Sequence, residues 1–162
     1  MTQRGHEGQR GHEGQRGPEG STSGDTLCAG TATGELLWLD EPLSFWGGTS
    51  LDDGIIVDVH HSQCGAALGG RVLVMSASRG SSSSSSVLAE QIRAGVGPAA
   101  IVLSSRDAIV TLGALAAAEV YGIHMPILLL DDMARAELPR SGAVTVTADG
   151  EIAAVSWKAH GK

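Results

Sequence analysis

The sequence predicts an α/β domain with a β/β/α architecture, in which helices and a second β layer cover the two faces of a parallel central sheet. Three short apolar runs at 71–75, 99–103 and 126–130 have the aliphatic, partly β-branched composition of buried strands. Two segments of helical character separate these runs, as expected for parallel strands joined by right-handed crossovers. Strand-like pairs near 26–40 and 144–157 flank this region and supply the second β layer.

Length and composition favour a single domain with its own core, because the chain has 162 residues and 42% of them are hydrophobic. Aromatic residues make up only 3%, so the core must be built from Ala, Val, Leu and Ile. The formal net charge of −7, with a pI near 5.2, argues against a nucleic-acid partner, which needs a basic face. A small anionic substrate remains compatible, since a local site can oppose the overall charge.

Two cysteines, Cys28 and Cys64, are too few for a cysteine-ligated metal or iron–sulfur site, which typically takes about three or four. We expect both to be reduced thiols and expect no metal ligands in this chain. No run approaches about eighteen apolar residues and the N-terminus has no apolar signal segment, so neither membrane insertion nor export is expected. We therefore expect a cytoplasmic location.

Residues 3–20 are three copies of a six-residue unit, QRGHEG, QRGHEG and QRGPEG. A repeat without apolar residues cannot bury surface, so we expect a disordered low-complexity tail over 1–24 and the folded domain over 25–162. A solvated tail is favoured over weak metal binding at His6 and His12.

The first elements of the domain are expected to be two strands within 26–40, separated by a turn at Thr33 and Gly34. The next loop places Phe45 beside Trp46 and closes with Gly47 and Gly48. Aromatic residues on a glycine-hinged loop act either as a cover over a ligand or as a plug over the core. Both alternatives stay open for this loop.

A short strand at 55–57 is expected to lead into Asp58, Val59, His60 and His61. Adjacent side chains of an extended chain point to opposite sides, so the two histidines make a poor metal chelate. One of them can still reach a binding site.

The centre of the chain, from Arg71 to Arg93, reads as a buried strand, a small-residue turn and an amphipathic helix that begins at Ser84 or Ser85. The first N–H groups of a helix favour an anion. In the turn, Gly80 allows close approach of a ligand, Arg79 supplies a guanidinium fork, and 81–83 supply hydroxyl groups. The alternative, a flexible serine linker, is disfavoured by the core-type strand and helix on either side.

The remaining elements follow from their boundaries. Glycines at 95 and 97 end the first helix, Asp107 is expected to cap a helix over 108–121, and Gly122 ends it. A short helix over 131–138 and a closing hairpin around 148–150 complete the domain.

Three segments, taken together and in order, resemble the small, swivel-domain subunit of the aconitase X type dehydratases. They are Glu41-Pro-Leu-Ser-Phe-Trp-Gly-Gly48, Asp58-Val-His-His61, and Gly70-Arg-Val-Leu-Val74 running into Ser78-Arg-Gly-Ser-Ser82. The resemblance covers essentially Asp25 to Trp157. It implies a swivelling β/β/α domain that forms a heterodimer with a larger subunit, completes an active site at their interface and is active only there.

The resemblance also implies site residues. In ordinary aconitases the matching turn is glycine, two serines and arginine, with the first serine as catalytic base. Gly80, Ser81 and Ser82 match this pattern, which makes Ser81 the expected base, but Ser83 stands where arginine would be, so carboxylate binding is expected at Arg79. The other expected substrate-binding residues are Gly80, Ser82, Ser83, Phe45, Trp46, Gly47, Gly48 and His60. A metal ion or iron–sulfur cluster is expected on the larger subunit.

The family includes dehydratases of cis-3-hydroxy-L-proline and of phosphomevalonate, and the Phe-Trp-Gly-Gly loop and the all-serine turn resemble the hydroxyproline group more. The expected chemistry is removal of the proton α to a carboxylate and loss of the β-hydroxyl as water, with Arg79 and the N–H groups of Ser82 and Ser83 stabilising the developing charge. The main alternative is a non-catalytic module that binds a small anion. A serine hydrolase is disfavoured because no G-x-S-x-G motif is present.

Overall fold

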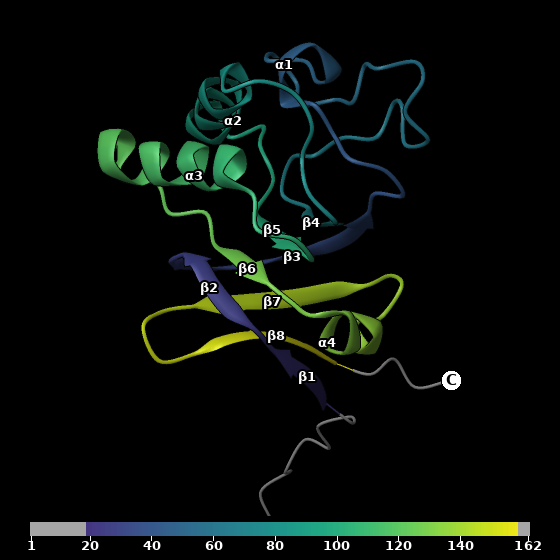
Figure 1. Ribbon diagram of the computed structural model, residues 1–162, viewed down its shortest axis with the longest axis vertical. Helices are drawn as coiled ribbons and strands as arrows, with labels where there is room; N and C mark the ends of the chain where they lie inside the picture. Colours follow the sequence, from purple (N-terminus) through teal and green to yellow (C-terminus); the bar gives the residue numbers. More distant parts are fainter. Residues whose placement is uncertain (1–18, 159–162) are drawn as a thin grey trace, which may run out of the picture.

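A computed structural model describes residues 19–158 (Figure 1). The strands are β1 (Glu19–Ser23), β2 (Asp25–Cys28), β3 (Gly30–Trp38), β4 (Val72–Met75), β5 (Ala100–Leu103), β6 (Ile127–Leu129), β7 (Ala143–Ala148) and β8 (Ala153–Lys158). The helices are α1 (Phe45–Gly48), α2 (Ser83–Ala94), α3 (Ala108–Tyr121) and α4 (Asp132–Glu137).

The strands form one mixed sheet in the order β1-β8-β7-β3-β4-β5-β6-β2. The pairs from β3 to β6 are parallel, whereas β7 and β8 pair antiparallel with each other and with β3 and β1. Figure 1 shows α2 and α3 on one side of the parallel strands and the β7, β8 and β1 layer on the other. The predicted β/β/α architecture is therefore confirmed, as are the three central strands and the closing hairpin.

Two hydrophobic cores lie on the two faces of the central strands. Along β4, Leu73 and Met75 pack into the core beneath the helices, whereas Val72 and Val74 pack into the core between the β layers. All four side chains are fully buried. Two-sided burial explains why these strands read as continuous apolar runs rather than as alternating patterns.

The two long helices pack closely because α3 carries Gly113 where it crosses α2. A Cβ at this position would lie 2.8 Å from the carbonyl oxygen of Ser85 and 3.2 Å from the Cβ of Leu88. The hydroxyl of Ser85 donates a hydrogen bond to the carbonyl of Ile109 at 2.7 Å, which adds a polar contact at the same crossing. The helix contact thus leaves no room for a side chain at 113.

The helix boundaries confirm the expected caps. The side chain of Asp107 accepts hydrogen bonds from the N–H groups of Ile109 and Val110 at the start of α3. Gly95 and Gly122 adopt left-handed conformations at the ends of α2 and α3, with φ of 75° and 69°. The short helix predicted over 131–138 is α4, and none of the described helices is long and apolar enough to cross a membrane.

The predicted boundary of the tail at residue 24 is wrong, because 19–23 form β1. This strand pairs antiparallel with β8, from Glu19 opposite Lys158 to Ser23 opposite Ala154. Backbone pairing needs no apolar side chains, so the composition of the repeat did not reveal it. The rest of the predicted tail, 1–18, lies outside the described residues.

Two further strand predictions are wrong. The expected turn at Thr33 and Gly34 lies inside the continuous strand β3, where a Cβ on Gly34 would lie 2.3 Å from the carbonyl oxygen of Gly70. That glycine marks a close backbone approach rather than a turn. The segment 55–57 forms only isolated bridges, Ile56 with Thr49 and Ile55 with Ala67.

Replacing Gly113 with alanine is expected to destabilise the protein by about 1–3 kcal/mol, because the new methyl group meets the α2 backbone. The sign is diagnostic, since alanine in a helix interior is otherwise better than glycine by about 0.5–1 kcal/mol. Urea unfolding measures the difference. Gly150→Ala is the matched control, because no heavy atom lies within 4 Å of its Cβ position. A stabilised Gly113→Ala variant would contradict the close packing of α2 and α3.

A chain that starts at Asp25 is expected to melt at least about 5 °C below one that starts at Glu19. The shorter chain loses the pairing of β1 with β8, the buried Thr22 and the packing of Gly20 against the indole of Trp157. Thermal unfolding followed by circular dichroism compares the two chains. Equal melting temperatures would mean that β1 adds nothing to the fold.

Candidate active site

The serine turn, defined here as 76–83, connects the carboxyl end of β4 to α2, as the sequence predicts. Gly80 has a φ of 112°, and a Cβ there would lie 3.0 Å from the hydroxyl oxygen of Ser44. The N–H of Arg79 donates to the carbonyl of Leu43 at 3.0 Å, beside a parallel bridge between Leu43 and Ser78. The turn is therefore held against the loop that carries the aromatic residues.

The six serines divide into two groups. Of the serines at 81–86, Ser81, Ser82, Ser83 and Ser86 are exposed, whereas Ser84 and Ser85 are buried. The hydroxyl of Ser84 accepts a hydrogen bond from the N–H of Trp46 at 3.2 Å, so it anchors the aromatic loop to α2. The helix begins at Ser83, one residue before the predicted start, and this ordered arrangement excludes a flexible linker.

The first N–H groups of α2 are partly satisfied, because those of Ser84 and Ser85 donate to the carbonyls of Ser81 and Ser82 at 3.0 Å. The N-cap residue Ser82 makes no side-chain capping hydrogen bond, and the N–H of Ser83 has only a long contact of 3.4 Å to the hydroxyl of Ser81. Helix N–H groups without strong partners, at the positive end of the dipole, favour a bound anion. The hydroxyl of Ser81 lies beside them.

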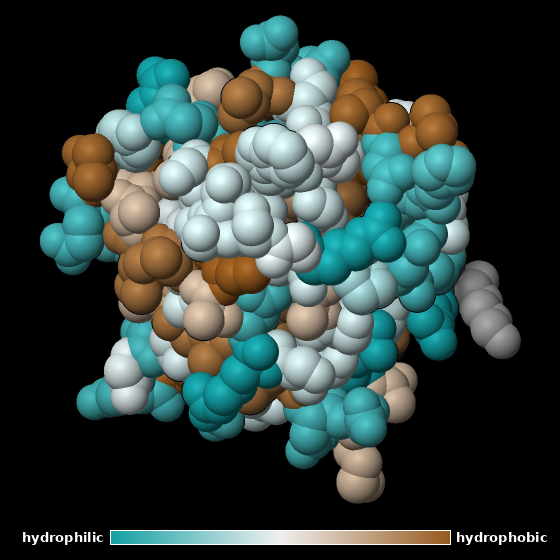
Figure 2. All heavy atoms as spheres, turned by 45° about the horizontal axis from the view of Figure 1, so that its top comes forward, coloured by the Kyte–Doolittle hydropathy of each residue, from teal (hydrophilic) through white to brown (hydrophobic). Residues whose placement is uncertain are grey.

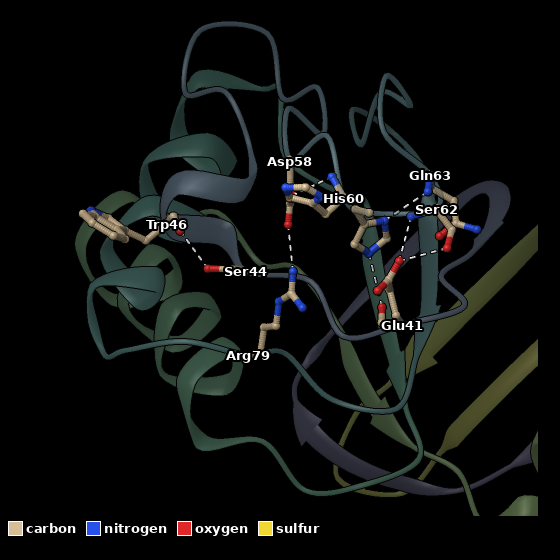
Figure 3. A network of polar contacts seen from close by, with 9 residues as sticks. Glu41, Ser44, Trp46, Asp58, His60, Ser62, Gln63 and Arg79 are labelled. Carbon is tan, nitrogen blue, oxygen red and sulfur yellow. Dashed lines mark hydrogen bonds and ion pairs between the residues drawn. The ribbon is translucent and has the colours of Figure 1, made fainter.

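Arg79 extends from the serine turn toward the 49–70 loop (Figure 3). Its Nη2 atom donates to the Oδ2 atom of Asp58 at 2.7 Å. The Arg79 side chain is 48% exposed and that of Asp58 is 21% exposed, so the guanidinium stays accessible from solvent.

Asp58 and His60 form one local unit. The Oδ1 atom of Asp58 accepts a hydrogen bond from the N–H of His60 at 2.9 Å. This bond, together with the Arg79 guanidinium, holds the pKa of the Asp58 carboxyl below its usual range, so the group is ionised at neutral pH. The imidazole of His60 is exposed on the same loop.

His61 faces the interior whereas His60 is exposed, so the two side chains point to different sides as predicted, although the chain here forms a turn and is not extended. Its Nδ1 atom accepts a hydrogen bond from the N–H of Gln63 at 3.1 Å, and its Nε2 atom lies 3.3 Å from the carbonyl oxygen of Glu41. Hydrogen bonds from the N–H and hydroxyl of Ser62 lower the pKa of the Glu41 carboxyl. His61 is therefore part of the loop structure.

The aromatic loop combines both alternatives left open by the sequence. Phe45 is fully buried and packs in the core beneath the helices, so the prediction that it binds substrate is wrong. Trp46 is 62% exposed, next to Gly47 with a φ of 78°. Figure 2 turns this end of the molecule toward the viewer and shows separate hydrophobic residues among paler and hydrophilic ones. Trp46 is thus available to a ligand or partner.

Asp107 is a site residue whose second role the sequence analysis missed. Its Oδ2 atom accepts hydrogen bonds from both the N–H and the hydroxyl of Ser78, each at 2.6 Å, while its Oδ1 atom caps α3. The strand order contained the signal, because the carboxyl ends of neighbouring parallel strands meet at one edge of a sheet. Asp107 follows β5 as Ser78 follows β4, which places them together.

Within residues 19–158, no group of three or more His, Cys, Asp or Glu residues could hold a metal ion. Cys28 is buried, which raises the pKa of its thiol, and Cys64 is exposed on a loop. These residues do not fit a metal centre or cluster. The site can instead offer a helix N-terminus, a guanidinium and a positioned hydroxyl to a carboxylate ligand.

Comparisons with known proteins agree with the fold. The family model described as "Aconitase X swivel domain" matches residues 21–155. A cis-3-hydroxy-L-proline dehydratase from Pseudomonas aeruginosa is 46% identical over 107 residues, which are 66% of this chain and 18% of that protein. The phosphomevalonate dehydratase small subunit of Pyrococcus furiosus is 34% identical over 80% of this chain and 97% of that subunit.

The match to the hydroxyproline enzymes is partial in length, since it spans 18% of the Pseudomonas protein and 17% of a Hypocrea jecorina one. Among solved structures, the holo-form of Thermococcus kodakaraensis aconitase X superimposes with a TM-score of 0.72 at 26% identity, over 84% of this chain and 96% of that one. The family match covers nearly all described residues and the architecture is shared, so this chain belongs to the aconitase X swivel domain family.

Proposed function

We propose that this chain is the small component of a two-component dehydratase and that the assembled enzyme dehydrates cis-3-hydroxy-L-proline. The observation that carries this proposal is the serine turn, in which the exposed Ser81 lies beside the N-terminus of α2 and Arg79. The 46% identity to the Pseudomonas enzyme supports the substrate. The Pyrococcus relative, which is matched over 97% of its length, is named a small subunit, and this name supports a larger partner.

The reaction removes the proton on the carbon α to the carboxylate and breaks the bond from the β-carbon to its hydroxyl, which leaves as water. Such a proton is weakly acidic, because negative charge develops on the carboxylate as it departs. Arg79 and the N–H groups of Ser82 and Ser83 stabilise that charge. Ser81 accepts the proton, and the positive end of the α2 dipole and the guanidinium favour its alkoxide form.

The departing hydroxyl needs an acid, and residues 19–158 offer no metal site that could serve as one. A metal ion or iron–sulfur cluster on the larger component would act as a Lewis acid there. The described residues of this chain do not fit such a centre, so their part is restricted to binding the carboxylate, orienting it and moving the proton.

Phosphomevalonate is the second candidate substrate. It is favoured by the small-subunit relatives, which match this chain over most of their length, although at lower identity. Arg79 suits a phosphate as well as a carboxylate. A non-catalytic role in binding a small anion would use the same turn. Assays for dehydration of the two substrates distinguish this role from the two enzymatic ones.

The isolated chain is expected to fold but to catalyse no dehydration, because its described residues hold no metal centre. We expect turnover of cis-3-hydroxy-L-proline only after it is combined with its larger component. Purified components are assayed separately and together, with phosphomevalonate as the comparison substrate. Turnover by the isolated chain would contradict the two-component proposal, and turnover of neither substrate by the assembly would favour the anion-binding role.

Ser81→Ala is expected to lower turnover of the assembled enzyme by about 10²–10⁴-fold, the usual effect of losing a positioned general base. Folding and assembly should survive, since Ser81 is exposed. Ser86→Ala is the matched control, because Ser86 is also exposed but lies along α2 beyond the turn, and its activity should stay near normal. If Ser82→Ala abolishes turnover while Ser81→Ala does not, the base is misassigned. If all three variants are active, the serines are structural.

A further inference from the structure

Asp58 connects three segments of the candidate site. Its Oδ2 atom accepts the hydrogen bond from Arg79, its Oδ1 atom accepts the N–H of His60, and its own N–H donates to the carbonyl of Gly48 at 3.3 Å. Gly48 ends the aromatic loop, and its carbonyl also accepts a hydrogen bond from the N–H of Val57 at 2.9 Å. Asp58 therefore links the serine turn and the histidine pair through its carboxylate (Figure 3) and the Trp46 loop through its backbone N–H.

Arg79 is fixed at both of its ends. Its backbone N–H is bonded to Leu43, and its guanidinium is bonded to Asp58 through a single nitrogen, Nη2. A guanidinium has five N–H donors in a planar fork, so the donors that do not face Asp58 remain for another carboxylate. The Arg79 side chain is held in one orientation, and some of its hydrogen-bond donors remain free for a ligand.

We infer that Asp58 is a positioning residue, which holds the Arg79 guanidinium beside the serine turn so that its remaining donors meet the substrate carboxylate. The inference rests on the proposed function. An exposed ion pair contributes little to the stability of a fold. The value of this pair is that it orders a long side chain before the substrate arrives.

The opposite role is a competitor, in which Asp58 occupies Arg79 and weakens substrate binding. The two roles differ in sign. Removing a positioning carboxylate lowers kcat/KM, whereas removing a competing carboxylate raises it. Among the ion pairs of the described residues, Arg79 is paired with Asp58 and with no second carboxylate.

The test is a double-mutant cycle on the assembled enzyme with Asp58→Asn, Arg79→Ala and the combination, measured as kcat/KM for cis-3-hydroxy-L-proline. Asparagine keeps an oxygen for the His60 N–H, so the loop stays folded. We expect Asp58→Asn to lower kcat/KM by about tenfold or more, mainly through KM, and to have almost no further effect in the Arg79→Ala background.

Asp53→Asn is the matched control. Asp53 lies in the same loop, and its Oδ1 atom accepts a hydrogen bond from the N–H of Ile55 at 3.1 Å, but Arg79 is not its partner. This variant should keep normal kcat/KM, and all variants should keep the wild-type melting temperature. Equal losses from Asp58→Asn with and without Arg79 would identify a purely structural role, and a gain in kcat/KM would identify a competitor. Either result overturns the inference.

A second measurement does not depend on the reaction. In the full chain labelled with ¹⁵N, the Arg79 Nε–H resonance should be sharp in the wild type and in Asp53→Asn, and broadened or lost to solvent exchange in Asp58→Asn. An unchanged resonance in Asp58→Asn overturns the positioning role. If the wild-type assembly does not dehydrate cis-3-hydroxy-L-proline, the proposed function fails, and this measurement still decides whether Asp58 orders Arg79.

Discussion

Every side chain of β4 and β5 is fully buried, half against the helices and half against the antiparallel strands. This two-sided burial fixes the register of the parallel strands, because a shift by one residue would exchange the two sets of side chains. It also brings the carboxyl ends of both strands to one edge of the sheet. The turns that follow them, with Ser78 after β4 and Asp107 after β5, meet at that edge as a consequence.

Two sets of hydrogen bonds hold the serine turn of the candidate site at that edge. Asp107 is nearly buried, caps α3 and accepts two hydrogen bonds from Ser78. These bonds connect the beginning of the serine turn to the start of α3. Arg79, the next residue of the turn, is hydrogen-bonded to Asp58, which lies in a loop that has almost no regular strand. Rigid support on one side and a polar tether on the other leave Ser81 exposed on a turn of defined shape.

The elements that could be predicted from sequence are those set by local chemistry. The apolar run at 71–75, the cap at Asp107 and the glycines at the ends of α2 and α3 act over a few residues, and each prediction is confirmed. The predictions that were wrong have long-range causes. Gly34 lies close to the backbone of Gly70, which leaves no room for a side chain, and 19–23 form a strand because they pair with the edge of β8. Likewise, the pairing of Arg79 with Asp58 spans 21 positions, and no periodicity in the chain indicates it.

The pairing of β1 with β8 has a consequence for how this domain can be joined to other chains. Glu19 lies opposite Lys158, so the two ends of the described fold emerge side by side from neighbouring strands. A domain with adjacent ends can be attached to a larger polypeptide through either end, or spliced into one, without disturbing its interior. The same fold can therefore serve as a separate subunit of nearly its own length, as in the Pyrococcus relative, or as less than a fifth of a single long chain, as in the Pseudomonas one.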